Sequence, residues 1–235
     1  MDIVFKDPIC KNIAIRLSGG PDSAIIYYAI CNFYKGHPDV QIFPYTMASP
    51  LRPHSIKKSQ DIINFTAAAT GKVPTKHYSL YHLDHNNSNS LEVNNFEYVN
   101  GQELLEKTLL SEQAIDIIYS GLSMNCPANE LEKFTNSLNV VKSMKYQDAM
   151  SSRDTDRDSE FLPSMSFIGS YYFCLPFVNV DKRTVKTVFD QHSVTQTLFP
   201  LTWSCESSDQ SDFINPKHCG ACYFCLEREF VFGRL

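Results

Sequence analysis

The sequence predicts an α/β fold, a Rossmann-like parallel sheet with helices on both faces. Short apolar runs that predict strands alternate along the chain with longer segments that carry a helical apolar pattern. Strands that alternate with helices form parallel sheets, and right-handed crossovers bring the helices onto the sheet. The chain of 235 residues, with 43% hydrophobic and 20% charged residues, is long enough for one such domain and a small appendage.

The first strand–turn–helix unit lies near the start of the chain. Ile13–Leu17 is a β-branched apolar run that predicts a buried strand, and Ala24–Phe33 predicts a helix capped by Asp22 or Ser23. The turn between them reads S-G-G-P-D-S. Its two glycines let backbone N–H groups approach an anion, and the helix N-terminus adds further donors. The alternative is an ordinary turn without a ligand, but the full string predicts a cradle for nucleotide phosphates.

The rest of the chain continues this alternation. Further strands or extended segments are predicted at Val40–Tyr45, Lys76–Leu80, Ile115–Tyr119 and Phe173–Val180. Helices are predicted at Ser55–Thr70 (stopped by Gly71), Gln102–Gln113, Leu131–Met144 and Lys182–His192. Polar segments at Asp84–Ser90 and Gln147–Glu160 predict loops, the second of them either solvated or an active-site cover.

Residues after the second and fourth strands are candidates for ligand binding. Tyr45 and Met47 are expected at the carboxyl end of the second strand, and Gly121 follows the fourth. Open parallel sheets bind ligands at the carboxyl edge of their strands. We therefore expect Tyr45, Met47 and Gly121 to contribute to nucleotide binding.

Composition narrows the classes of partner and compartment. A net charge of −5 argues against a general nucleic-acid binder. The N-terminus has no basic region followed by a long apolar run, so we expect no signal peptide, no membrane span and a cytoplasmic protein. In a reducing compartment, the clustered members of the eight cysteines indicate metal binding or catalysis more often than disulfides.

Four cysteines near the C-terminus form a candidate metal site. Cys219, Cys222 and Cys225 follow one another at x2 spacing, and Cys205 precedes them. Four thiolates satisfy a tetrahedral structural Zn²⁺ ion, and x2 spacing suits a tight knuckle. Buried cysteines without a ligand and an iron–sulfur cluster are the alternatives. The fold prediction thus ends in a C-terminal four-cysteine zinc knuckle.

The glycine turn resembles the PP-loop of the ATP pyrophosphatases, which split ATP between the α and β phosphates. It lacks the Gly-Lys-Ser/Thr of a Walker A sequence and also lacks G-x-G-x-x-G. The resemblance implies a PP-loop, or adenine nucleotide alpha hydrolase-like, fold. It also implies that Ser18, Gly19, Gly20, Asp22 and Ser23 surround the pyrophosphate of ATP and its Mg²⁺.

The end of the chain resembles one family within this group. Thr202–Cys205 and Cys219–Arg228, followed by Phe230, are similar to the C-terminus of 7-cyano-7-deazaguanine synthase, which serves queuosine and deazaguanine biosynthesis. The likeness spans most of the chain and is strongest at its two ends. It implies residues 1–200 as a PP-loop ATP-binding domain and residues 201–235 as a zinc-binding segment packed on it.

The resemblance also carries over individual residues. Lys182 matches a family lysine within Pro176–Val194, and Arg52 and His54 resemble a spread-out form of an Arg-His pair after the second strand. The implied reaction adenylates the carboxylate of 7-carboxy-7-deazaguanine, with release of pyrophosphate. Ammonia then gives the amide, and a second activation gives the nitrile. Asp22 and Lys182 are the expected catalytic residues, since such a site must neutralise phosphate charge; an exposed lysine is the alternative for Lys182.

One region departs from the family pattern. After the fourth strand, where the family has a pocket Asp and Arg, this chain has Ala128 and Glu130. The Arg-to-Glu change reverses a charge and removes a donor fork. Three alternatives to the family reaction therefore stand: acyl transfer to another amine such as a protein N-terminus, a tRNA-modifying PP-loop enzyme, and an inactive nucleotide-binding subunit. The resemblance suggests a small deazaguanine substrate and a homodimer; a protein acceptor is an option, and a nucleic-acid partner is disfavoured.

Overall fold

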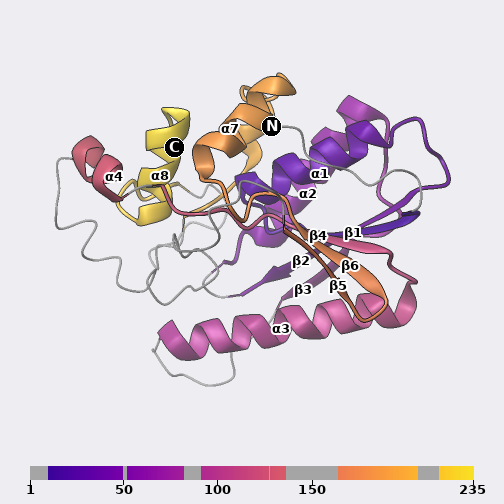
Figure 1. The fold of residues 1–235 in the computed structure, drawn as a ribbon. Helices are drawn as coiled ribbons and strands as arrows, with labels where there is room; N and C mark the ends of the chain where they lie inside the picture. Colours follow the sequence, from indigo (N-terminus) through magenta and orange to yellow (C-terminus); the bar gives the residue numbers. More distant parts are fainter. Residues whose placement is uncertain (1–9, 50–51, 82–90, 127, 136–163, 206–216) are drawn as a thin grey trace.

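A six-stranded sheet forms the centre of the molecule (Figure 1). A computed structural model describes residues 10–49, 52–81, 91–126, 128–135, 164–205 and 217–235. The strands are β1 (Asn12–Arg16), β2 (Gln41–Ala48), β3 (Tyr78–Tyr81), β4 (Ile117–Ser120), β5 (Ser164–Ile168) and β6 (Tyr171–Leu175). Their order is β3-β2-β1-β4-β6-β5, and every neighbouring pair is parallel except the β5–β6 hairpin.

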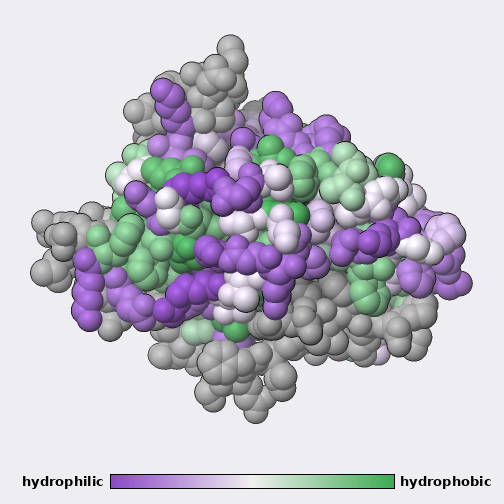
Figure 2. Space-filling model, turned by 90° about the horizontal axis from the view of Figure 1, so that it is seen from above, coloured by the Kyte–Doolittle hydropathy of each residue, from purple (hydrophilic) through white to green (hydrophobic). Residues whose placement is uncertain are grey.

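Helices cover both faces of this sheet, so the predicted fold class is confirmed. They are α1 (Pro21–Phe33), α2 (Ser55–Thr70), α3 (Leu91–Glu112), α4 (Ala128–Thr135), α7 (Lys182–Gln191) and α8 (Tyr223–Phe232), with a 3-10 turn η2 at Phe199–Leu201. Helix α3 lies under one face, and α1, α2 and α7 lie over the other (Figure 1). Each face has its own apolar core, the larger one on the side of α1. Seen from that side, hydrophilic side chains interleave with apolar ones, and the apolar ones gather toward the end that carries α4 and α8 (Figure 2).

Several predicted elements differ from the observed ones in their bounds. Helix α1 begins at Pro21 with Gly20 as its N-cap, so the predicted capping by Asp22 or Ser23 is wrong. Proline is common at the first helical position, because the N–H that it lacks would have no partner within the helix there. By contrast, α2 has the predicted bounds, and Gly71 ends it in the left-handed conformation at φ +74°.

Strand β2 runs to Ala48, beyond the end that Pro44 predicted at Tyr45. The N–H of Ile42 faces the side chain of Thr75, and residues two apart in a strand point the same way. The missing N–H of Pro44 therefore faces the side of β3, where pairing begins only at Tyr45. The proline costs no ladder hydrogen bond, so the strand continues through it.

Other differences are additions or extensions. Helix α3 is longer than the predicted segment, and β6 overlaps only the first part of the extended segment predicted at Phe173–Val180. Strand β5 and helix α8 were not predicted. Of the predicted helix Leu131–Met144, the structure has α4 at Ala128–Thr135. The remainder of that helix and both predicted loops, at 84–90 and 147–160, lie outside the described residues. Among the described helices, none combines the length and apolarity that a membrane crossing requires.

The strand order identifies the ligand edge of the sheet. From β1 the chain proceeds outward through β2 to β3, and it then returns to place β4 on the other side of β1. Open α/β sheets bind ligands outside the carboxyl ends of the strands at such a switch point. The segments that leave β1 and β4 are the glycine turn and the stretch that begins at Gly121.

Candidate functional site

The glycine turn after β1 is held from within by two serines. The hydroxyl of Ser23 accepts a hydrogen bond from the backbone N–H of Ser18 at 3.2 Å and donates one to the carbonyl of Gly20 at 3.1 Å. The Ser18 hydroxyl accepts from the N–H of Gly20 at 3.3 Å. Gly19 has φ +84°, a conformation that L side chains rarely adopt. The turn thus delivers the chain into the N-terminus of α1, where first-turn N–H groups lack intrahelical acceptors.

Gly121, at the end of β4, packs against the start of α1. A Cβ at this position would lie 2.6 Å from the backbone nitrogen of Ser23 and 2.8 Å from the carbonyl carbon of Asp22. Backbone atoms at those distances cannot give way as a flexible side chain can. Glycine is therefore needed here for close packing between β4 and α1, and it keeps the two carboxyl-end segments together.

A buried ion cluster lies at this junction. The Lys182 ammonium, at the start of α7, donates to Asp22 Oδ2 at 2.6 Å, and the Ser123 hydroxyl donates to the same oxygen at 2.9 Å. Glu227 Oε2 lies 3.9 Å from Lys182 Nζ. The side chains of Lys182, Asp22 and Glu227 are 7%, 10% and 1% exposed. Sequence reasoning selected Asp22 and Lys182 separately, and the structure brings them into direct contact.

Glu227 is held in place by neutral donors as well. Its Oε1 accepts from the Tyr223 hydroxyl at 3.0 Å and from the backbone N–H of Cys126 at 3.4 Å. Burial, followed by the charge of Glu227, raises the pKa of the Cys126 thiol well above its usual range. A raised pKa favours the neutral thiol, which is the less reactive form of cysteine. Helix α8, which carries Glu227, thus reaches the segment after β4.

Two buried oxygens near this cluster have no hydrogen-bond partner among the described residues. They are Oδ1 of Asp22 and Oδ1 of Asn125. Buried polar atoms are normally paired, so such atoms point to a ligand or ion. A carboxylate oxygen suits Mg²⁺, which is held by one or two carboxylates together with phosphate oxygens. The residues at the glycine turn fit the metal-bound nucleotide that the sequence predicted.

Tyr45 and Met47 lie elsewhere. Both are within β2, and their side chains belong to the apolar core beneath α3. The Tyr45 hydroxyl accepts from Arg16 Nε at 2.8 Å and donates to Glu106 Oε2 at 3.0 Å. Tyr45 lies three residues before the end of β2, whereas Met47, next to the last residue Ala48, lies at the carboxyl end where it was expected. The backbone carbonyl of Tyr45 accepts from the N–H of Leu17, directly before the glycine turn, at 2.9 Å.

The four C-terminal cysteines converge. The thiol sulfurs of Cys205, Cys219, Cys222 and Cys225 all lie within 4.8 Å of one another. The Cys219 sulfur also accepts from the backbone N–H groups of Ala221 at 3.4 Å and Cys222 at 3.2 Å. Gly220 makes the turn possible with φ +70°. This set is a candidate site for a metal ion, as the spacing predicted, and α8 begins immediately after Cys222.

The residues taken from the family resemblance have varied surroundings. His54 is buried and its ring meets Trp203 edge-on, with centroids 5.2 Å apart. Burial, and then the charge of Lys58, lowers the pKa of His54. Glu130, which replaces the family arginine, pairs with Arg183 Nη1 at 2.8 Å.

Sequence reasoning missed two members of the ion cluster, Ser123 and Glu227. Ser123 lies just after the predicted fourth strand, so its position at the sheet edge was available as a signal. Glu227 follows the last cysteine ligand candidate, where the chain was expected to be rich in loops. Its role depends on α8 folding against α4 and α7, which no local pattern indicates.

Comparisons with known proteins give little beyond the fold. The chain matches no protein-family model and no curated protein sequence. Among solved structures, it is similar to the U34-tRNA thiolase NcsA from Methanococcus maripaludis, which was solved with its 4Fe-4S cluster. That likeness has a TM-score of 0.47 and 17% sequence identity, over 94% of this chain and 70% of that chain. The fold assignment stands on the sheet order and helix placement described above.

Proposed function

We propose that this protein is an ATP-dependent ligase of the 7-cyano-7-deazaguanine synthase type. In the proposed reaction, a carboxylate oxygen of 7-carboxy-7-deazaguanine attacks the α-phosphorus of ATP. The α–β phosphoanhydride bond breaks, pyrophosphate leaves, and an acyl adenylate remains. Ammonia attacks the acyl carbon, AMP leaves, and a second activation of the amide removes water to give the nitrile. The products from ATP are AMP and pyrophosphate.

The observation that carries this proposal is the Lys182–Asp22 pair beside the glycine turn. The turn and the start of α1 offer backbone donors and a positive helix end to phosphate oxygens. Lys182 supplies a cation within reach of the same place, at 2.6 Å from Asp22. A buried, charge-lined site of this kind can stabilise a leaving pyrophosphate.

The chain's own residues have distinct tasks in this scheme. Lys182 would exchange Asp22 for phosphate oxygens, with Glu227 remaining as its second carboxylate at 3.9 Å. Asp22 Oδ1, which has no hydrogen-bond partner among the described residues, is the atom available to hold Mg²⁺. Mg²⁺, when bound, supplies neutralisation of charge on the phosphate oxygens. Gly121 keeps these groups close by letting the end of β4 contact the start of α1.

A second candidate keeps the activation step and changes the acceptor. Glu130 stands where the family has an arginine, and it is engaged with Arg183 at 2.8 Å. Asn125 Oδ1, nearby in sequence, lacks a partner in the described part of the chain and could accept from an amine. These features support acyl transfer to an amine other than ammonia, such as a protein N-terminus.

We propose Zn²⁺ as the ion of the four-cysteine site. Around a single tetrahedral Zn²⁺ with Zn–S bonds of about 2.3 Å, sulfur atoms lie about 3.8 Å apart. The sulfurs of Cys219 and Cys225 are 3.8 Å apart, and the whole set lies within 4.8 Å. A 4Fe-4S cluster binds each thiolate to a different iron and would need more room between the sulfurs. The spacing of the sulfurs therefore supports a single structural ion. We treat the segment that holds it, residues 201–235, as an appendage to the ATP-binding domain.

Product analysis tests the proposed function. The protein is incubated with ATP, Mg²⁺, ammonium and 7-carboxy-7-deazaguanine, and the products are identified by mass spectrometry. We expect AMP, pyrophosphate and the amide or nitrile, and no AMP when the base is omitted. AMP formation that needs a peptide amine in place of ammonium favours the second candidate. AMP formation that depends on tRNA and not on the base contradicts both, and ATP binding without AMP under every condition indicates an inactive subunit.

A further inference from the structure

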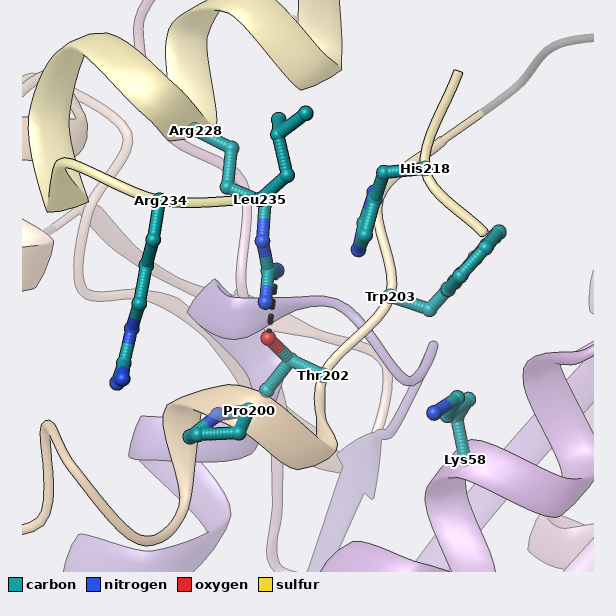
Figure 3. Close-up of a pocket in the computed structure, with 8 residues that line it drawn as sticks. All are labelled: Lys58, Pro200, Thr202, Trp203, His218, Arg228, Arg234 and Leu235. Atoms are coloured by element: carbon teal, nitrogen blue, oxygen red, sulfur yellow. Dashed lines mark hydrogen bonds between the residues drawn. The ribbon is translucent and has the colours of Figure 1, made fainter. Parts of the chain in front are cut away.

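A second, basic pocket lies on the other side of the glycine turn. Its volume is about 220 Å³. It is lined by Lys58, Pro200, Thr202, Trp203, His218, Arg228, Arg234 and Leu235 (Figure 3). Three of these side chains are basic, Lys58, Arg228 and Arg234, and no Asp or Glu is among the lining residues. The residues come from α2, the segment around η2, the cysteine segment and α8, so only the folded chain forms the pocket.

Arg228 contributes a buried charge whose hydrogen-bond acceptors are both neutral. The residue is 2% exposed. Its Nη1 donates to the Thr202 hydroxyl at 2.8 Å and its Nη2 donates to the Phe199 carbonyl at 3.1 Å. Its Nε has no partner within the described ranges of the chain. A buried cation normally has a counter-ion, because burial disfavours an uncompensated charge.

The other two cations add to the same imbalance. Arg234 donates to the neutral oxygens of Gln196 and Thr195, and it shares the ring of Phe199 with Arg228. Burial lowers the pKa of Arg228 to about 10; the charge of Cys225 opposes this shift, and the charge of Arg234 adds to it. The Lys58 ammonium lies 5.8 Å from the centroid of the Trp203 ring. Burial lowers its pKa, the charge of Asp61 opposes this, and the charges of Lys57 and Arg228 add to it. The three positive charges repel one another, and an anion that binds between them would reduce this repulsion.

The pocket adjoins the nucleotide turn through the backbone. The N–H of Trp203, in the pocket wall, donates to the carbonyl of Gly19 at 2.8 Å. A Cβ on Gly19 would lie 3.0 Å from Lys58 Cβ. A pocket of 220 Å³ is below the range of about 300–1,000 Å³ that holds whole small-molecule ligands. It has room for a small anion or one charged group.

We propose that this pocket binds a phosphate oxyanion, with Lys58, Arg228 and Arg234 as its cations. Guanidinium and ammonium groups are the usual protein partners of phosphate. The anion is either free pyrophosphate or the phosphate group of a nucleotide, and both present the same oxygens to the pocket. Only the identification of free pyrophosphate as a reaction product rests on the proposed function. The site itself requires no turnover.

The test is calorimetric titration of the full chain with sodium pyrophosphate and, in a second arm, with AMP, in magnesium-free buffer. We expect the wild type to bind, Lys58→Gln and Arg234→Gln each to weaken binding by about tenfold or more, and added NaCl to weaken it further. Lys57→Gln is the matched control, since it removes one positive charge from the neighbouring position of α2, where the side chain is 75% exposed and paired with Asp61. It should change the affinity by less than about twofold.

Each outcome decides the proposal. Tighter binding of pyrophosphate identifies the free oxyanion as the ligand, and tighter binding of AMP identifies a nucleotide phosphate; both support the site if Lys58→Gln weakens them. Absence of binding to the wild type overturns the proposal, and so does equal affinity in wild type, Lys58→Gln and Arg234→Gln. Lys182→Gln separates this proposal from the function: it should abolish AMP formation and leave pyrophosphate affinity at the pocket within about twofold. Thermal unfolding of each variant confirms that the chain is folded.

Discussion

The ion cluster and the basic pocket, which both adjoin the glycine turn, differ in how their buried cations are paired. Helix α8 contributes one residue to each, and the two residues are consecutive in the sequence. Glu227 faces the ion cluster, where Lys182 has two carboxylates within 3.9 Å. Arg228 faces the basic pocket, where its donors meet only Thr202 and a backbone carbonyl. Lys182 is therefore ion-paired with a carboxylate, whereas the hydrogen bonds of Arg228 go to neutral acceptors and the opposing charge that acts on it is that of Cys225.

This difference indicates how each side would treat an anion. In the ion cluster, an incoming phosphate must compete with Asp22, so binding there involves an exchange of partners for Lys182. In the basic pocket, no described carboxylate has to be displaced, and an anion would relieve the repulsion between Arg228 and Arg234. A paired buried charge is costly to break, whereas an unpaired one is costly to keep. The cluster suits a reacting group, and the pocket suits a bound one.

Loss of the metal ion should disrupt both the ion cluster and the basic pocket. Helix α8 begins immediately after Cys222 and carries Glu227 and Arg228. A structural zinc ion contributes an apparent binding free energy of about 10 kcal/mol or more. We expect about one zinc per chain by elemental analysis, and we expect chelation to abolish AMP formation and pyrophosphate binding together. Cys31→Ser, a buried cysteine outside the cluster, should retain its zinc. A metal-free chain that still forms AMP would contradict this view of the cysteine segment.

Asp22→Asn should separate the two sides. The amide keeps the shape of the side chain and removes the charge that holds Lys182 and that could bind Mg²⁺. We expect AMP formation to fall by at least about 100-fold, the scale observed when one electrostatic group is lost from an active site. Pyrophosphate affinity at the basic pocket should stay within about twofold. Asp39→Asn, at a side chain 58% exposed, is the matched control for both assays. Unchanged turnover would remove the glycine turn from the mechanism.

Gly121→Ala tests the close packing between β4 and α1. The added Cβ would meet the Ser23 nitrogen at 2.6 Å, so the start of α1 must move. We expect a loss of about 1–3 kcal/mol in the free energy of unfolding, and a KM for ATP raised by about tenfold. Gly36→Ala is the matched control, because a Cβ there meets no atom within 4 Å. Equal melting temperatures for the two variants would show that this contact can relax without cost.

The features that could be predicted from the sequence are those that depend on local spacing and turn residues. The strand–turn–helix at the start of the chain and the convergence of Cys205 with the three later cysteines follow from local spacing and turn chemistry. The bounds of α2 follow from an apolar pattern with a glycine at its end. In each case the signal and the structure lie within one segment.

The features that sequence could not predict depend on long-range packing. Glu227 reaches Lys182, and Arg228 lines the same pocket as Lys58, only because α8 packs against α4 and α7. The end of β2 was predicted too early for a different reason. The register of β2 shows that Pro44 faces the side of β3 before pairing begins, and only the neighbouring strand reveals this. The sequence shows which side chains are charged, but it does not show which side chains they pair with.

Glu227→Gln should weaken the ion cluster without dismantling it. The amide oxygen can still accept from Tyr223 and Cys126, so the fold should be retained, while Lys182 loses its second carboxylate. We expect kcat for AMP formation to fall by about tenfold, with little change in melting temperature or in pyrophosphate affinity. Tyr223→Phe, which removes a hydrogen bond and keeps the charge, should have a smaller effect on kcat. An equal loss in both variants would indicate that packing around Glu227, and not its charge, matters.

The smallest effect is expected at the exposed pair of Glu130 and Arg183. The atoms are 2.8 Å apart, but the side chains are 41% and 48% exposed, so water screens the pair. Arg183→Gln should therefore change the free energy of unfolding by no more than about 1 kcal/mol, and the change should shrink at high salt. If the pair lies at the acceptor end, the KM for the amine should change by a few-fold while the KM for ATP stays constant. Lys186→Gln, on the same helix and paired with Asp190, is the control; an equal change in both variants would exclude a role for Arg183 in acceptor binding.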